Sequence, residues 1–167
     1  MNKIKRLNES YAKHIAVPWR QDAAPAQRVI FCVYDETDEL QLRINLDEFG
    51  ISTRTAAHEW LPIDITKTFS SWLSKQKYAN KYFENPNLLS TLMPKYAEYI
   101  LEVFKNQITE GKANSNTVVA VYGVGSLFGF LKVKDVVDQI APCVTGRLLV
   151  FFPGSYEDNN YRLLDGY

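Results

Sequence analysis

The chain has 167 residues, of which 46% are hydrophobic and 23% are charged, and its 19 basic residues balance 19 acidic ones. This length and composition fit one globular domain that buries a substantial core. A net charge of zero argues against a protein whose main task is to grip nucleic acid, because such proteins carry a domain-wide basic surface.

The N-terminal segment, residues 1–27, carries an excess of positive charge. Residues 1–28 contain six basic side chains and two acidic ones. A solvated basic arm or a helix accounts for this excess, and a direct nucleic-acid contact is the alternative. The segment lacks the apolar stretch of a signal peptide, and no apolar run in the chain approaches about 18 residues, the length of a membrane span. We therefore expect a cytoplasmic protein without membrane contact, in which Cys32 and Cys143 are free thiols.

Four short apolar runs predict β-strands within a single domain at residues 28–167. They lie at Arg28–Asp35, Trp60–Ile65, Thr117–Tyr122 and Arg147–Phe152. Most of these runs are continuous rather than alternating, which indicates strands buried on both faces, as in a parallel sheet covered by helices. Pro62 lacks a backbone N–H and therefore places the second strand near an edge of the sheet.

Helical patterns fill the gaps between these strands, at Asp38–Phe49, Thr66–Leu73, Leu92–Ile108 and Val133–Ile140. The first is predicted to end before Gly50, although its leucines and isoleucine at 40, 42, 44 and 46 also alternate as in a strand. Gly111 is predicted to stop the third. This order of elements predicts an α/β fold: a single layered domain with a mostly parallel sheet of four to five strands flanked by helices.

A glycine-rich turn, Gly123–Gly129, follows the third predicted strand. Such a turn lets the backbone approach an anion, so Gly123, Gly125 and Ser126 are the residues of an alternative nucleotide- or DNA-binding function. However, the spacing G-x-G-x-x-x-G departs by one residue from the dinucleotide fingerprint, and no Gly-Lys-Ser/Thr follows. The apolar residues Leu127, Phe128 and Phe130 favour a tight turn that presents hydrophobic side chains to a partner.

A polar segment, residues 153–162, follows the last predicted strand. Loops at the carboxyl ends of parallel strands are common ligand sites, so Tyr156, Tyr161 and Arg162 are further candidates for partner binding. Glu157, Asp158 and Asp165 provide oxygen ligands for a cation, but they do not follow an EF-hand pattern. A structured turn held by its own hydrogen bonds is the favoured interpretation.

No complete catalytic or metal site can be assembled from the sequence. Cys32 or Ser126 with His58 would be a nucleophile and a base, but no Gly-x-Ser-x-Gly elbow surrounds the serine. The acidic cluster at Asp35–Glu39 opens a predicted helix, where the helix dipole favours negative charge. We expect no catalytic residue, no metal and no cofactor.

Three segments in the C-terminal third carry a family resemblance: VVAVYGVGSLFG at 118–129, GRLLVFFPG at 146–154 and YEDNNYRLLD at 156–165. Together with RVIFCVYDETDEL, which begins at residue 28, they resemble the BrxB family of BREX (bacteriophage exclusion) systems. The resemblance covers about residues 28–166, and the segment from 146 to 165 is its most distinctive part. Members of this family continue past the position of Asp165 with a further strand, so the resemblance also implies that this chain, which stops at Tyr167, is shortened.

The resemblance implies a setting and a set of partners. BrxB proteins are encoded beside a large ATPase, a DNA adenine methyltransferase and PglZ, and no catalytic motif is established for them. It therefore implies a non-catalytic core subunit of a phage-defence complex. We expect it to bind PglZ or the BREX ATPase, in an assembly that includes the methyltransferase, and to contact DNA only indirectly or weakly.

Overall fold

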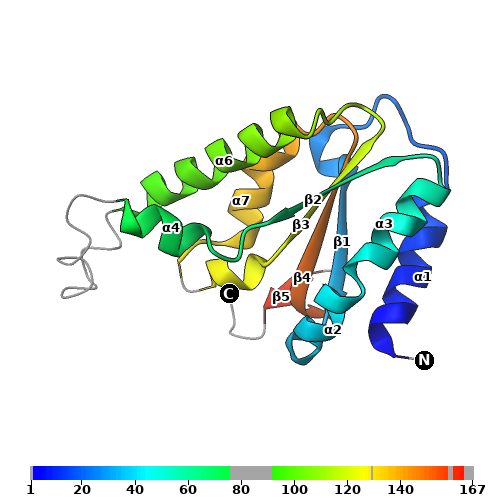
Figure 1. Ribbon diagram of the computed structural model, residues 1–167, viewed down its shortest axis with the longest axis horizontal. Coiled ribbons are helices and arrows are strands. Elements are labelled where there is room, and N and C mark those ends of the chain that lie inside the picture. The colour runs from blue at the N-terminus through cyan, green and yellow to red at the C-terminus, as the bar shows by residue number, and fades with distance from the viewer. Residues whose placement is uncertain (1, 76–91, 129, 158–159, 164–167) are drawn as a thin grey trace.

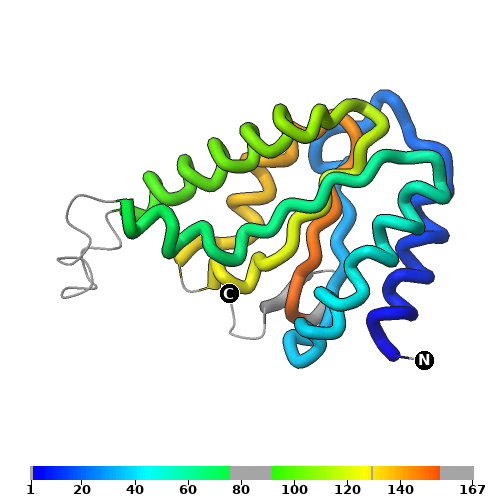
Figure 2. The backbone as a smooth tube through the Cα atoms, in the orientation of Figure 1, coloured from blue at the N-terminus to red at the C-terminus, as the bar shows by residue number. Residues whose placement is uncertain are grey.

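A computed structural model describes the backbone of residues 2–75, 92–128, 130–157 and 160–163, and the side chains of those up to residue 154. Four parallel strands form its sheet in the order β1-β4-β3-β2, with helices on both faces (Figures 1 and 2). The strands are β1 Val29–Tyr34, β2 Glu59–Asp64, β3 Thr117–Tyr122 and β4 Arg147–Glu157. The predicted α/β class and parallel sheet are confirmed, and β2, which contains Pro62, lies at an edge.

The helices divide between the two faces of the sheet (Figure 1). On one face lie α1 (Lys3–Ile15), α2 (Glu39–Ile44) and α3 (Leu46–Thr55); on the other lie α4 (Thr68–Ser74), α6 (Met93–Glu110) and α7 (Val133–Ile140). Each face has its own hydrophobic core, because alternate residues of a strand point to opposite faces. Val119, Val121, Leu148 and Val150 belong to the core under α6 and α7, whereas Val118, Ala120, Leu149 and Phe151 belong to the core under α1 and α3.

The connections explain why the helices are divided in this way. The segment with α2 and α3 carries the chain from β1 across the sheet to β2, and the chain then returns through β3 to β4, one strand at a time. Since crossovers between parallel strands are right-handed, a reversal of direction moves the connecting helix to the opposite face. Because all four strands run parallel, their carboxyl ends lie together along one edge of the sheet, which we call the carboxyl edge.

The N-terminal segment is a helix rather than a solvated arm. Ile4, Tyr11 and Ile15 of α1 are buried against the sheet and α3, and the Tyr11 hydroxyl lies 2.6 Å from the Thr53 hydroxyl. Burial raises the pKa of Tyr11 well above its ordinary value. Within residues 1–27, Lys3–Ile15 therefore form a helix whose three buried apolar residues complete a core.

The helix predicted at Asp38–Phe49 was wrong in two details. It is divided into α2 and α3 at Asn45, whose side-chain amide donates to the Gln41 carbonyl at 2.8 Å. It also continues through Gly50 to Thr55, since Gly50 is not a stop signal but a point of close packing. A Cβ atom at Gly50 would lie 3.0 Å from the indole ring of Trp60. The other three predicted helices are present, with ends shifted by two residues or fewer.

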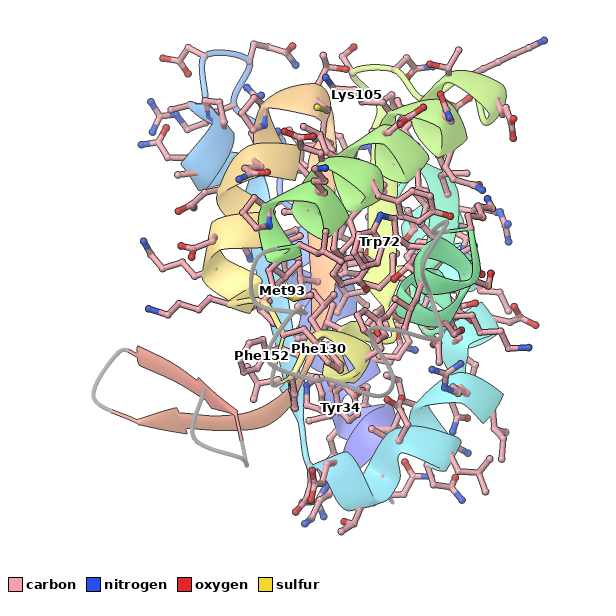
Figure 3. The ribbon with its side chains drawn as sticks, turned by 90° about the vertical axis from the view of Figure 1, so that its left-hand side faces the viewer. Tyr34, Trp72, Met93, Lys105, Phe130 and Phe152 are labelled. Carbon is pink, nitrogen blue, oxygen red and sulfur yellow. The ribbon has the colours of Figure 1, made fainter. Side chains whose placement is uncertain are left out.

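The segment at 153–162, expected to be a turn, extends the last strand instead. β4 continues to Glu157 and pairs antiparallel with β5 (Asn160–Leu163), with Tyr156 opposite Tyr161 and Ser155 opposite Arg162. This hairpin projects from the carboxyl edge (Figure 3).

Among the described residues, no helix is both long and apolar enough to cross a membrane.

Candidate functional site at the carboxyl edge of the sheet

Polar side chains from α2, β2 and β3 meet at the carboxyl edge around Arg43. This guanidinium donates to the Thr66 hydroxyl at 2.7 Å, and it lies 3.6 Å from carboxylate oxygens of both Asp64 and Glu39. Its central carbon lies 5.3 Å from the centre of the Tyr122 ring. Each of the three guanidinium nitrogens therefore faces a protein oxygen.

The partners of Arg43 are themselves bound to one another. Asp64 accepts hydrogen bonds from the backbone N–H of Thr66, at 2.9 Å, and from its hydroxyl. The Tyr34 hydroxyl, at the end of β1, donates to Glu39 at 2.8 Å. Burial and this acceptor carboxylate raise the pKa of Tyr34 far above its ordinary value. The network connects the ends of β1 and β2 to α2 and so holds the edge in one geometry.

Sequence analysis did not find this network. Arg43 and Thr66 are 23 residues apart and belong to no shared local pattern. Asp64 and Thr66 are the only local signal, because an Asp two residues before a Thr commonly accepts its backbone N–H at the end of a strand.

The glycine-rich turn closes on its own backbone. Gly123 has a φ of 82°, and a Cβ atom there would lie 2.8 Å from an Asp64 carboxylate oxygen. The following residues, Val124–Leu127, form one short 3-10 helix. The Ser126 hydroxyl donates to the carbonyls of Gly123, at 2.8 Å, and of Ile65, at 3.1 Å, and its backbone N–H donates to Gly123. Gly123, Gly125 and Ser126 lie together in this turn, which offers no long helix N-terminus to an anion.

Aromatic side chains surround this turn on the α4 side. The exposed ring of Phe130 stacks on Phe69, with centroids 4.1 Å apart and planes 14° apart. Phe69 meets Tyr96 edge to face at 5.2 Å and contacts Trp72. We call Phe69, Trp72, Tyr96 and Phe130 the aromatic cluster. Figure 3 shows Phe130 at the same end of the sheet as Tyr34 and Phe152.

The predicted partner-binding residues occupy three different environments. Leu127 has no exposed surface, so the expectation that it contacts a partner was wrong; it completes the core under α6 and α7. Phe128 is half-buried, and Phe130 keeps 38% of its surface exposed. Tyr156, Tyr161 and Arg162 lie on the hairpin of β4 and β5, and their side chains lie outside the described residues.

Comparison with known proteins identifies the family. Residues 61–167 match the family described as BREX protein BrxB, which is nearly two thirds of the chain. The chain belongs to the BrxB family. It is therefore a component of a BREX phage-defence system, and other BREX proteins are its partners in general. No curated protein and no solved structure matches the chain.

The part that matches BrxB runs from β2 to the C-terminus and contains the glycine-rich turn, the aromatic cluster and the hairpin. Of the side chains considered for nucleophilic catalysis, only Ser126 lies within it. Ser126 lies at the carboxyl edge, whereas His58 directly precedes β2 at the opposite edge. There the His58 ring stacks on Trp19 at 3.7 Å and its Nδ1 lies 2.6 Å from the Asn116 side-chain oxygen. Burial raises the pKa of the Cys32 thiol to about 12, so this thiol is not a ready nucleophile near neutral pH.

The acidic residues of this BrxB chain do not gather into a metal site within the described ranges, where no three His, Cys, Asp or Glu side chains are placed to hold an ion. Asp35 instead caps the turn that follows β1, by accepting from the N–H and the hydroxyl of Thr37. These hydrogen bonds lower the pKa of Asp35. The possible cation ligands Asp158 and Asp165 lie outside the described residues, and for Glu157 only the backbone is described.

Proposed function

We propose that this chain is a non-catalytic core subunit that helps to hold a BREX complex together by binding another BREX protein, PglZ or the BREX ATPase. The observation that carries this proposal is the exposed ring of Phe130 at the carboxyl edge. Exposed aromatic rings held rigidly by their neighbours are typical of the residues that dominate protein interfaces, because they bury a large area at a low cost in conformational entropy.

The polar groups at the carboxyl edge support a binding role rather than a catalytic one. Arg43, Asp64, Thr66 and Ser126 are each bound to other protein groups, as described above. A catalytic site needs a nucleophile within reach of a base and a place for substrate beside both. The edge instead provides a fixed support for the aromatic cluster and the hairpin. Contact with DNA would then be made mainly by other subunits.

Co-expression with PglZ and with the ATPase, followed by size-exclusion chromatography, tests the proposal. We expect co-elution with one of them at micromolar concentration. Phe130→Ala should weaken that binding by about tenfold or more, as truncation of a central aromatic contact does. Val17→Ala is the matched control, because Val17 is 61% exposed and lies on the segment after α1, away from the carboxyl edge.

Two results would contradict the proposal. If the chain elutes alone with every BREX protein, it is not a binding subunit of this kind. If it co-elutes but Phe130→Ala binds as tightly as Val17→Ala does, the aromatic cluster is not the contact. Thermal melting of both variants shows whether the chain is still folded.

A further inference from the structure

A small cavity lies between α1 and the end of β1, at the carboxyl edge of the sheet. Its volume is about 240 Å³. Its apolar lining comes from Ile4 and Leu7 of α1 and from Val33 of β1. Figure 1 shows the first turns of α1 at the same end of the molecule as α2. In parallel α/β sheets, small ligands usually bind at this edge.

Charged side chains of both signs line the same cavity. Lys3 and Arg6 lie three residues apart on α1 and so share one side of the helix. Asp35 and Asp38 line the cavity from the turn that follows β1. Among the described residues, neither of the two basic side chains forms an ion pair with a carboxylate. The cavity therefore separates two positive charges from two negative ones.

Asp38 is the acidic residue that lacks a partner. It is half-buried, and one of its carboxylate oxygens is buried and has no hydrogen-bond partner in the described part of the chain. A buried polar atom without a partner is costly, so it calls for a group that the chain itself does not supply. Asp35 differs, because it accepts two hydrogen bonds from Thr37. These bonds first, and the charge of Lys3 to a smaller extent, lower the pKa of Asp35.

The mixed charges of the cavity select the kind of ligand. A cation bound by the two aspartates would face the two basic side chains, and an anion bound by the basic side chains would face the aspartates. Like charges placed so close together oppose binding. A zwitterion avoids both conflicts, because each of its charged groups meets the opposite sign. The cavity is smaller than the sites of about 300–1,000 Å³ that hold drug-sized ligands, so the ligand is small.

We propose that this cavity binds a free aliphatic α-amino acid of about the size of leucine. The carboxylate of the ligand contacts Lys3 and Arg6, its ammonium group contacts Asp38, and its side chain packs on the apolar lining. The inference goes beyond the proposed function, because it concerns a small molecule rather than a protein partner. All the lining residues precede residue 61, so the cavity lies outside the part of the chain that matches BrxB.

An NMR titration of the isotope-labelled chain with L-leucine tests the site. We expect saturable shifts concentrated in the amides of residues 3–10 and 33–39, with a dissociation constant of about 1 mM or lower. Three probes separate the contributions to binding. Isoamylamine lacks only the carboxylate of leucine, 4-methylpentanoate lacks only the ammonium group, and glycine lacks the aliphatic side chain. Each should bind at least about tenfold more weakly than leucine.

Two variants assign the charged contacts. Arg6→Gln and Asp38→Asn should each weaken leucine binding by about fivefold or more, because each removes one charged partner of the ligand. The Asp38 side chain does not cap α2, so Asp38→Asn should melt at the same temperature as wild type. Lys13→Gln, in the last turn of α1, and Asp135→Asn, on α7, are the matched controls. They remove the same charges away from the cavity and should leave leucine binding unchanged.

Three results would overturn the inference. The first is the absence of saturable shifts up to about 10 mM leucine, which is ten times the expected dissociation constant. The second is binding of isoamylamine or 4-methylpentanoate as tight as that of leucine, because the cavity would then select a single charge. The third is a set of shifts centred on another part of the chain. None of these results bears on co-elution with PglZ or the ATPase, so the proposed function is tested separately.

Discussion

Replacing Gly123 with alanine adds one methyl group. We expect this change to destabilise the carboxyl edge more than a methyl group added at any other position there. The backbone at Gly123 has a φ of 82°, where an alanine costs about 1–2 kcal/mol. The new Cβ atom would also collide with the Thr66 hydroxyl and lie 2.8 Å from Asp64. Moving these side chains weakens the hydrogen bond from Arg43, which is worth about 1.5–3 kcal/mol because the donor is charged. We therefore expect the free energy of unfolding to fall by about 2–4 kcal/mol.

Urea unfolding measures this loss, provided that the slope of the free energy of unfolding against urea concentration is the same in the variant as in wild type. Gly125→Ala is the control, because its φ is not positive and its Cβ atom would meet only Pro153, at 3.7 Å. It should change stability by less than about 1 kcal/mol in either direction. In the double variant Gly123→Ala with Thr66→Ala, the collision with the hydroxyl is absent, so the two losses should be less than additive. Equal stability of the two glycine variants would refute the reasoning.

Three further predictions concern buried and reactive groups. Because burial raises the pKa of Cys32 to about 12 from an ordinary value of 9.0, its thiol should resist a thiol reagent at pH 8 until the chain is unfolded. If both cysteines are labelled in the native state, Cys32 is not buried. Burial also raises the pKa of Tyr11 above its ordinary value of 10.0, so the stability contributed by the buried neutral phenol is present below pH 10 and is lost as the pH rises further. Tyr11→Phe should therefore lose less stability at high pH than wild type does. At neutral pH it should cost about 1 kcal/mol, because the hydrogen bond to Thr53 is missing. Ser126→Ala and His58→Ala should each leave phage protection in a plaque assay within about tenfold of wild type, because a non-catalytic subunit does not depend on a single nucleophile or base. Complete loss of protection in a variant that is folded and still binds its partner would contradict this expectation.

The strands and the fold class could be predicted because burial on both faces leaves a direct trace in the sequence. Thr117–Tyr122 is apolar at almost every position, and each of its central residues packs into one of the two cores. The predicted bounds of this strand are those of the structure. Pro62 likewise indicated an edge, because a proline removes a donor that a central strand would need.

The candidate site was only partly predictable, because its contacts join distant parts of the chain. The sequence pointed to the glycine-rich turn, yet the partner that requires glycine at position 123 is Thr66, in the turn that follows β2. Leu127 and Phe128 looked alike as apolar residues of one turn, but only the path of the 3-10 helix places Leu127 in the core and leaves Phe128 half-buried. A local pattern shows which residues are apolar, not which of them face inward.

The ambiguity at residues 38–49 carries information of its own. Leu40, Leu42, Ile44 and Leu46 alternate as in a strand, although the structure places them on α2 and at the start of α3. In a helix, positions two apart point about 200° away from each other, so alternating apolar residues fall on opposite sides. Leu42 duly faces the core, whereas Leu40 and Ile44 face outward. The alternation that made this helix hard to predict therefore combines Leu42 and Leu46, which pack in the core, with Leu40 and Ile44, which are exposed.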